Sequence, residues 1–302
     1  MSSDTDRTTS PTLTTPAGAP RIDRSPTTVE HPAPDAEVWS SLARKGVRKA
    51  RRRWASILGL RLVILVVALG AWQLAGTHWI DPFYISTPSA VARRIGDWIS
   101  DGTLATNLWA TLHVMLEGFA LGALGGTIVG FVLGLNRYAA RVLDPFIQAL
   151  YSIPKVALAP VFILWLGVGD DMRVVLTGTV VFFIVFWTAY AAVREVDAEL
   201  IDVVKLMGGR RRHTVLKVVA PGALPGILHG FKISIPYALI GTIVAELLAS
   251  SSGVGYLMQQ SQNQYDTAGL FAGLIALMVM AVVLDAILAV ADRYATRWRP
   301  EV

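Results

Sequence analysis

Long apolar stretches separated by short polar connections dominate the chain beyond its first 50 residues. A helix needs about 20 mainly apolar residues to cross the hydrocarbon core of a bilayer, and only helices and closed barrels satisfy the backbone there. The pattern therefore predicts an all-α polytopic membrane protein with about six transmembrane helices. The predicted spans are residues 57–76, 110–135, 145–167, 173–193, 228–249 and 267–290. Pro154 and Pro160 leave the local helix geometry of the third span open.

Residues 1–40 differ from the rest of the chain. They hold six of the 15 prolines and show no apolar periodicity, and such a segment buries too little apolar surface to offset the entropy of folding. The first ten residues also lack the basic start and apolar run of a secretory signal. We therefore expect a disordered cytoplasmic tail at 1–40, followed by one transmembrane domain at 41–302.

Composition excludes several classes of enzyme. Apolar residues make up 53% of the chain and charged residues 16%, whereas soluble domains carry about 25% charged residues. Without Cys there is no disulfide, thiolate metal site or cysteine nucleophile. The sequence has no phosphate-binding loop, H-E-x-x-H or G-x-S-x-G motif, and its five His are scattered. We expect neither a metal site nor catalysis on this chain.

The net charge of +5 is unevenly distributed along the chain. Seven Lys or Arg lie between Arg44 and Arg53, and six more lie between Arg194 and Lys217. Because short cytoplasmic loops of membrane proteins are enriched in Lys and Arg, this asymmetry predicts that both termini are cytoplasmic. The basic residues are also expected to contact anionic membrane lipid, which accounts for the net positive charge. No nucleic acid is therefore expected as a partner.

Glycines recur at every fourth position of the second span, at Gly118, Gly122, Gly126, Gly130 and Gly134. On a helix this spacing makes a ridge without side chains, here called the glycine ridge. Such a ridge lets another helix approach closely. We expect tight helix packing within the protein; the alternative is that this backbone lines a translocation path.

Charged residues inside spans are candidates for function, because a charge in lipid is expensive. Lys155 follows Pro154 near one end of the third span, where snorkelling to the interface is the structural alternative. Glu246 lies near the outer end of the fifth span, directly before the small-residue segment 249–255. That segment suits a gate or a re-entrant turn, and a capping or pairing role for Glu246 is the alternative.

The longest predicted cytoplasmic connection, residues 194–226, is here called the coupling loop. Apolar residues at helical spacing over 196–207 predict an amphipathic helix that breaks at Gly208-Gly209. A second amphipathic run, 214–219, is expected to end at Pro221. Such a helix–turn–helix could dock into the groove of a partner, and a solvated loop is the alternative.

The coupling loop resembles the E-A-A-x3-G-x9-I-x-L-P signature of permease subunits in binding-protein-dependent ABC importers. Asp202, Val203 and Val204 take the first three positions, Gly208 follows after three residues, and Pro221 closes the signature. Ala220 stands where leucine is usual. The similarity extends over about residues 105–299 and includes I-P-K-V-A-L-A-P at 153–160, A-E-L-L at 245–248 and G-V-G-Y at 253–256.

The resemblance implies the fold of a type I ABC importer permease in the bacterial inner membrane. It implies a non-catalytic subunit that forms a homodimer and works with two cytoplasmic ATPases, which bind ATP and Mg, and with an extracytoplasmic substrate-binding protein. A coupling helix at about 201–209 would contact the ATPase. The residues implied for coupling are Asp202, Val203, Val204, Leu206, Met207, Gly208 and Pro221. Those implied for the translocation path or gate are Pro154, Lys155, Ser234, Pro236, Glu246, Ser251 and Gly253.

The resemblance is closest to the nitrate, sulfonate and taurine group, and it favours a small anionic solute of the alkanesulfonate, taurine or nitrate class. Related permeases also serve bicarbonate, phthalate and pyrimidine precursors of thiamine. An ion-gradient-driven secondary transporter is the main alternative, although no inverted repeat is evident. An intramembrane enzyme would have only His113 and Glu117 as a nearby pair. A membrane scaffold for a cytoplasmic partner is the third alternative.

Overall fold

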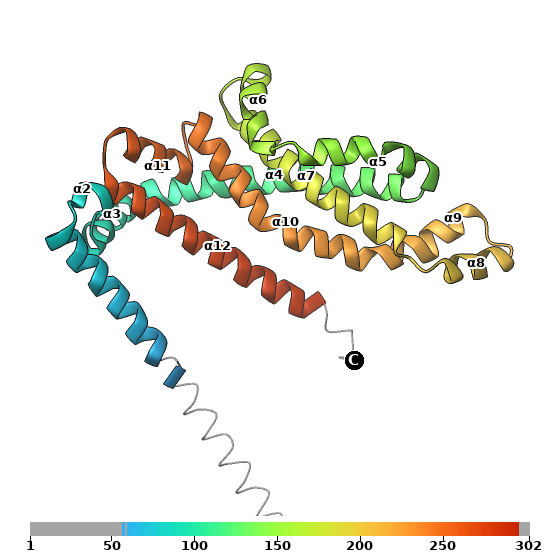
Figure 1. Cartoon of the computed structure of the whole chain (residues 1–302), viewed down its shortest axis with the longest axis horizontal. Coiled ribbons are helices and arrows are strands. Elements are labelled where there is room, and N and C mark those ends of the chain that lie inside the picture. The colour runs from blue at the N-terminus through green and yellow to red at the C-terminus, as the bar shows by residue number, and fades with distance from the viewer. Residues whose placement is uncertain (1–55, 58, 296–302) are drawn as a thin grey trace, which may run out of the picture. The chain divides into compact units, whose positions relative to one another are not determined.

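The computed structural model describes residues 56–57 and 59–295 of the 302-residue chain. The predicted tail at 1–40 lies outside these residues. The chain divides into two compact units, Met1–Val63 and Ile64–Val302. In the first unit the described residues 59–63 are helical. The packing reported below is that of the second unit (Figure 1).

All regular elements among the described residues are helical, as the apolar pattern predicted. The first apolar helix spans Gly59–Trp79 and ends in the π-helical turn η1 (Ala75–Trp79). The four other long helices are α4 (Thr103–Gly134), α7 (Asp170–Arg194), α10 (Ala220–Ala249) and α12 (Thr267–Ala295). The shorter elements are α2 (Pro82–Ile85), α3 (Pro88–Ser100), α5 (Arg137–Ser152), η2 (Lys155–Leu158), α6 (Ala159–Leu166), α8 (Ala198–Leu206), α9 (Arg211–Thr214), η3 (Val215–Val219) and α11 (Val254–Asn263).

Helix α7 packs along both α4 and α10, and these three helices form the centre of the second unit (Figure 1). The glycine ridge of α4 faces α7. A Cβ atom on Gly126 would lie 2.6 Å from the carbonyl oxygen of Phe182, and one on Gly118 would lie 2.9 Å from that of Val174. The two backbones therefore touch, which side chains on the ridge would prevent.

Small residues also bring α10 close to α7. A Cβ atom on Gly230 would lie 2.8 Å from the Cβ of Thr188. Further along, the buried hydroxyls of Thr177 and Thr242 are 3.0 Å apart and share a hydrogen bond. Apolar side chains of α4, α7, α10, α11 and α12 then fill one shared core.

A second packing region joins α3, α11 and α12 at one end of the unit (Figure 1). Val91 and Trp98 of α3 are buried against Leu257 of α11 and Ala272 of α12. Beside this apolar contact, Arg94 of α3 forms an ion pair of 2.7 Å with Asp266, which lies between α11 and α12. At the opposite end of the three central helices lie α8 and α9.

The third predicted span is not one straight helix. Its first part, α5, already begins at Arg137, and the axes of the two parts are bent by 82° at the break before Lys155. The cause is Pro154, which forces an extended conformation on the residue before it; Ile153 has φ −67° and ψ 127°. Five helices are long and apolar enough to cross a membrane, or up to six when this bent pair counts as one span. The prediction of about six spans is thus confirmed.

The prediction that the 214–219 run ends at Pro221 was wrong. Helical backbone continues from Arg211 through η3 into α10, and Pro221 lies in the first turn of α10. The wider π turn of η3 immediately before it explains this continuity. A π turn relaxes the i to i−4 ladder, so the missing N–H and the ring of proline are accommodated.

The contact between α4 and α7 yields a stability prediction. Gly126→Ala should destabilise the protein by about 1–3 kcal/mol, because its methyl group would meet the rigid backbone of Phe182 and Phe186. The matched control is Gly70→Ala in the first apolar helix, where a Cβ meets nothing within 4 Å. Thermal unfolding of the purified variants in detergent measures both. Equal melting temperatures would contradict the close backbone contact.

Candidate functional site

Two groups of candidate residues lie at opposite ends of the central helices, and the first is the coupling loop. Asp197 caps the N-terminus of α8, since its carboxylate accepts a hydrogen bond of 2.8 Å from the N–H of Glu199. On the exposed face of α8, Lys205 Nζ lies 2.8 Å from Asp202 Oδ1. Val196 and Ile201 pack against Val219 and the start of α10. One side of α8 is thus anchored while the other remains free.

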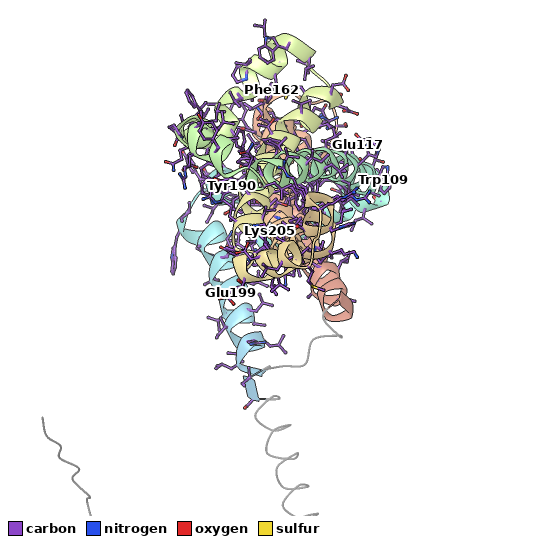
Figure 2. All side chains as sticks on the ribbon, turned by 90° about the vertical axis from the view of Figure 1, so that its right-hand side faces the viewer. Trp109, Glu117, Phe162, Tyr190, Glu199 and Lys205 are labelled. Atoms are coloured by element: carbon purple, nitrogen blue, oxygen red, sulfur yellow. The ribbon has the colours of Figure 1, made fainter. Side chains whose placement is uncertain are left out.

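The free end of α8 is apolar. The side chains of Leu206 and Met207 are 88% and 82% exposed, and Leu200 and Val203 are about half exposed. In Figure 2, which views the molecule from the α8 end, Glu199 and Lys205 of this helix are labelled. An exposed apolar helix end flanked by charges is the form of surface that docks into a partner's groove.

Gly208 ends α8 in a Schellman motif. Its N–H donates to the carbonyl of Lys205, and the N–H of Gly209 donates to that of Val204, both at 2.9 Å. The motif places Gly208 at φ +77°, a left-handed conformation that costs other residues energy. A Cβ on Gly208 would meet nothing within 4 Å. Glycine is therefore required here by the backbone angle and not by crowding.

Most of the residues expected along the translocation path are not brought together. Ser234 is buried, and its hydroxyl donates to the carbonyl of Phe231 at 2.9 Å. Pro236, two residues further along α10, is exposed. Lys155 Nζ donates to the carbonyl of Tyr151 and lies 4.1 Å from the centre of the Tyr151 ring. Lys155 is therefore held against the last turn of α5 across the break, next to the exposed Pro154.

The second group surrounds Glu246, whose side chain is buried with 1% of the residue exposed. Its Oε2 accepts hydrogen bonds from the hydroxyl of Thr111 at 3.0 Å and from the N–H of Gly255 at 2.8 Å. The other oxygen, Oε1, lies 3.7 Å from Nη1 of Arg173. Glu246 of α10 thus joins α4, α7 and the start of α11.

Polar groups of α4 and α7 also bind the segment 250–255, which consists of the connection after α10 and the first two residues of α11. The N–H of Gly253 donates to Asn107 Oδ1 at 2.8 Å, and the N–H of Val254 donates to Thr111 Oγ1 at 2.9 Å. Arg173 Nη1 donates to the carbonyl of Ser252 at 3.0 Å. We call Asn107, Thr111, Arg173, Glu246 and residues 250–255 the junction cluster.

Within the junction cluster, Gly253 has φ +107° and lies so close to Glu246 that a Cβ would be 2.6 Å from Oε2. Ser251, by contrast, is exposed at the turn. Glu246, Gly253 and Ser251 were predicted from the sequence as site residues. Their partners Arg173, Asn107 and Thr111 were not predicted. Arg173 could have been suspected from Asp170 one turn before it, with which it forms an ion pair.

Comparison with known proteins now identifies the chain. Residues 122–297 match the family described as binding-protein-dependent transport system inner membrane component. The chain belongs to this family. The match includes the coupling loop, Glu246 and the segment 250–255, and it makes the chain a membrane-embedded, non-catalytic transport permease.

Individual relatives agree with the family. The permease protein SsuC of Bacillus subtilis (strain 168), assigned to aliphatic sulfonates transport, is 32% identical over 258 residues, which cover 84% of this chain and 93% of the relative. The taurine transport system permease protein TauC of Escherichia coli (strain K12) is 28% identical over 274 residues, covering 87% and 99%. An inward-facing structure of the MetNI methionine ABC transporter has a TM-score of 0.58 at 20% identity, covering 66% of this chain and 98% of its own. The fold is that of an ABC importer permease.

The junction cluster yields a second prediction. Glu246→Ala should destabilise this permease by about 3–5 kcal/mol, because it removes the carboxylate that faces the buried Arg173 and leaves the N–H of Gly255 without its acceptor. The control Asp202→Ala removes an exposed ion pair on α8 and should cost at most about 1 kcal/mol. Thermal unfolding in detergent separates the two.

A double-mutant cycle isolates the pair itself. Arg173→Met and Glu246→Met together should cost less than the sum of the single changes, since each single change leaves the other group buried without its partner. Strict additivity of the two single losses would show that Arg173 and Glu246 do not interact.

Proposed function

We propose that this permease forms the translocation path of an ABC importer for a small anionic solute and couples to a separate ATPase through residues 194–226. In this proposal both termini and the coupling loop face the cytoplasm, and the junction cluster lies toward the outer face. The orientation is supported by the Lys and Arg between positions 194 and 217, which belong to the same end of the molecule as α8.

The exposed apolar end of α8 carries the coupling assignment. Leu206 and Met207 expose most of their apolar side chains, and exposure of that surface to water is unfavourable. The Schellman motif at Gly208 fixes the direction in which these side chains project. An ATPase groove that covers these two side chains removes their apolar surface from water. Asp202, Val203 and Val204 precede this end on α8, and Pro221 follows in α10.

The remaining partners follow from the proposed importer class. ATP and Mg²⁺ would bind to the ATPase, and this chain would need no cofactor of its own. A second copy of the chain would complete the path as a homodimer, and an extracytoplasmic binding protein would deliver the solute. The long exposed apolar faces of α4 and α12 would meet either that copy or membrane lipid.

The anionic solute class is supported by the names of SsuC and TauC, which refer to sulfonates and taurine. Lys155 offers a positive charge at the break between α5 and α6, and its side chain is only partly covered. A sulfonate carries its negative charge at every physiological pH, so a fixed cation along the path would lower the cost of leaving water.

A third prediction tests coupling. Gly208→Val should abolish solute uptake, because a β-branched residue at φ +77° disrupts the Schellman motif. When the tagged variant is purified gently, the ATPase should no longer co-purify with it. Gly102→Val is the matched control, since Gly102 has φ +76° and open space around its Cβ but connects α3 with α4. Mass spectrometry of co-purifying proteins and uptake by cells give the readouts. Undiminished uptake by Gly208→Val would refute the coupling assignment.

A fourth prediction concerns the solute class. In proteoliposomes that hold the complete transporter, taurine or an alkanesulfonate should stimulate ATP hydrolysis in the presence of the binding protein, and riboflavin should not. Lys155→Gln should reduce sulfonate uptake severalfold, while Lys155→Arg, which keeps the charge, should retain most of it. Stimulation by riboflavin alone would overturn the anionic assignment and leave the coupling assignment intact.

A further inference from the structure

A groove between α4, α5 and α7 has no role in the function proposed above. Its volume is about 650 Å³, within the range of small-molecule sites. The walls are apolar, and Leu143, Phe146 and Leu150 of α5 remain 41–65% exposed. The apolar lining includes Ile128 and Val132 of α4, Ala139 and Ile147 of α5, and Phe182 and Phe186 of α7.

Polar lining residues occur only where α4 ends and α9 begins. Asn136 caps the N-terminus of α5 and accepts hydrogen bonds from two backbone N–H groups, so its carbonyl oxygen is occupied. Arg211 is exposed, and no carboxylate among the described residues lies within ion-pair distance of it. The groove thus combines a long apolar wall with one uncompensated positive charge at its end.

We propose that the α4–α5–α7 groove binds an anionic phospholipid of the cytoplasmic leaflet, with one acyl chain along α5 and the phosphate at Arg211. The inference rests on the cytoplasmic orientation of the coupling loop in the proposed function. Basic pockets between membrane helices on the cytoplasmic side are typical sites for anionic headgroups. The α5 wall from Ala139 to Leu150 is about 16.5 Å long at 1.5 Å per residue, so it covers the upper part of an acyl chain.

Charge favours lipid over a second copy of the chain in this groove. A two-fold dimer within a membrane has its axis along the membrane normal, so equivalent residues of the two copies lie at the same depth. In a groove-to-groove dimer Arg211, which follows Arg210 and precedes Arg212, would then lie at the level of an identical basic segment. A phosphate instead supplies the negative charge that Arg211 lacks, and an acyl chain leaves no polar group unsatisfied against the apolar walls.

Native mass spectrometry of the full-length chain in mild detergent tests the proposal, with phosphatidylglycerol and phosphatidylcholine as probes. One phosphatidylglycerol should bind per chain in preference to phosphatidylcholine, and Arg211→Gln should weaken this binding about fivefold, the effect of one basic residue at a membrane surface. Arg212→Gln is the matched control, because Arg212 is exposed but does not line the groove. It should bind like the wild type.

A second variant tests the acyl-chain part. Ala139→Phe fills the groove from α5 and should reduce binding of phosphatidylglycerol while circular dichroism and gel filtration show an intact fold. Three outcomes would each overturn the proposal. Arg211→Gln and Arg212→Gln could weaken lipid binding equally, or the two lipids could bind equally well. The third is the formation of covalent dimers by a photo-crosslinker placed at Phe146. Lipid binding is read without ATP or solute, so its failure is distinct from failure of the transport assignment.

Discussion

Backbone contact between α4 and α7 is the interaction on which the rest of the structure depends. The glycine ridge lets the two helices touch over about four turns, from Gly118 near Thr177 to Gly134 near Val193. In a membrane no hydrophobic force drives helices together, so close van der Waals packing has to hold them. A contact this long also fixes the register, because a shift by one residue would place larger side chains, such as Phe119 and Phe131 or Leu121 and Leu133, against the backbone of α7.

That register determines which polar groups meet in the junction cluster. Asn107 and Thr111 lie on α4 before the first glycine of the ridge, and Arg173 lies at the start of α7. Their side chains reach the N–H groups of Gly253 and Val254 and the carbonyl of Ser252. They do so only because the ridge fixes the position of α4 along the axis of α7. Non-helical backbone inside a membrane protein is tolerated where protein groups satisfy it. The bend between α10 and α11 meets this condition with side chains of two other helices.

How much of this could be predicted from sequence depends on the range of the interaction. The spans, the amphipathic α8 and its end at Gly208 follow from local periodicity and from a glycine that breaks it. The break before Lys155 follows from Pro154, although the 82° bend does not. The pairing of Arg173 with Glu246 joins residues 73 positions apart and the bond from Asn107 to Gly253 joins residues 146 apart. No local pattern specifies such contacts, because they depend on the helix packing. Pro221 does not end the helix as predicted, because a π turn, which has no sequence signature, lies directly before α10.

Helix α10 connects the two candidate regions through one continuous backbone. Its 30 residues span about 45 Å at 1.5 Å per residue. At one end it packs against Val196 and Ile201 of the coupling loop, and at the other it carries Glu246. Because Gly226 and Gly230 set α10 directly against α7, it has little freedom to move away from that helix, and the motion left to it is rotation or sliding along α7. Either motion displaces Glu246 relative to Thr111 of α4 and so strains the junction cluster. Energetic coupling between distant sites requires an element whose arrangement both sites bias. Helix α10 contacts both of these regions, as α7 does through Arg173 at one end and Val193 at the other.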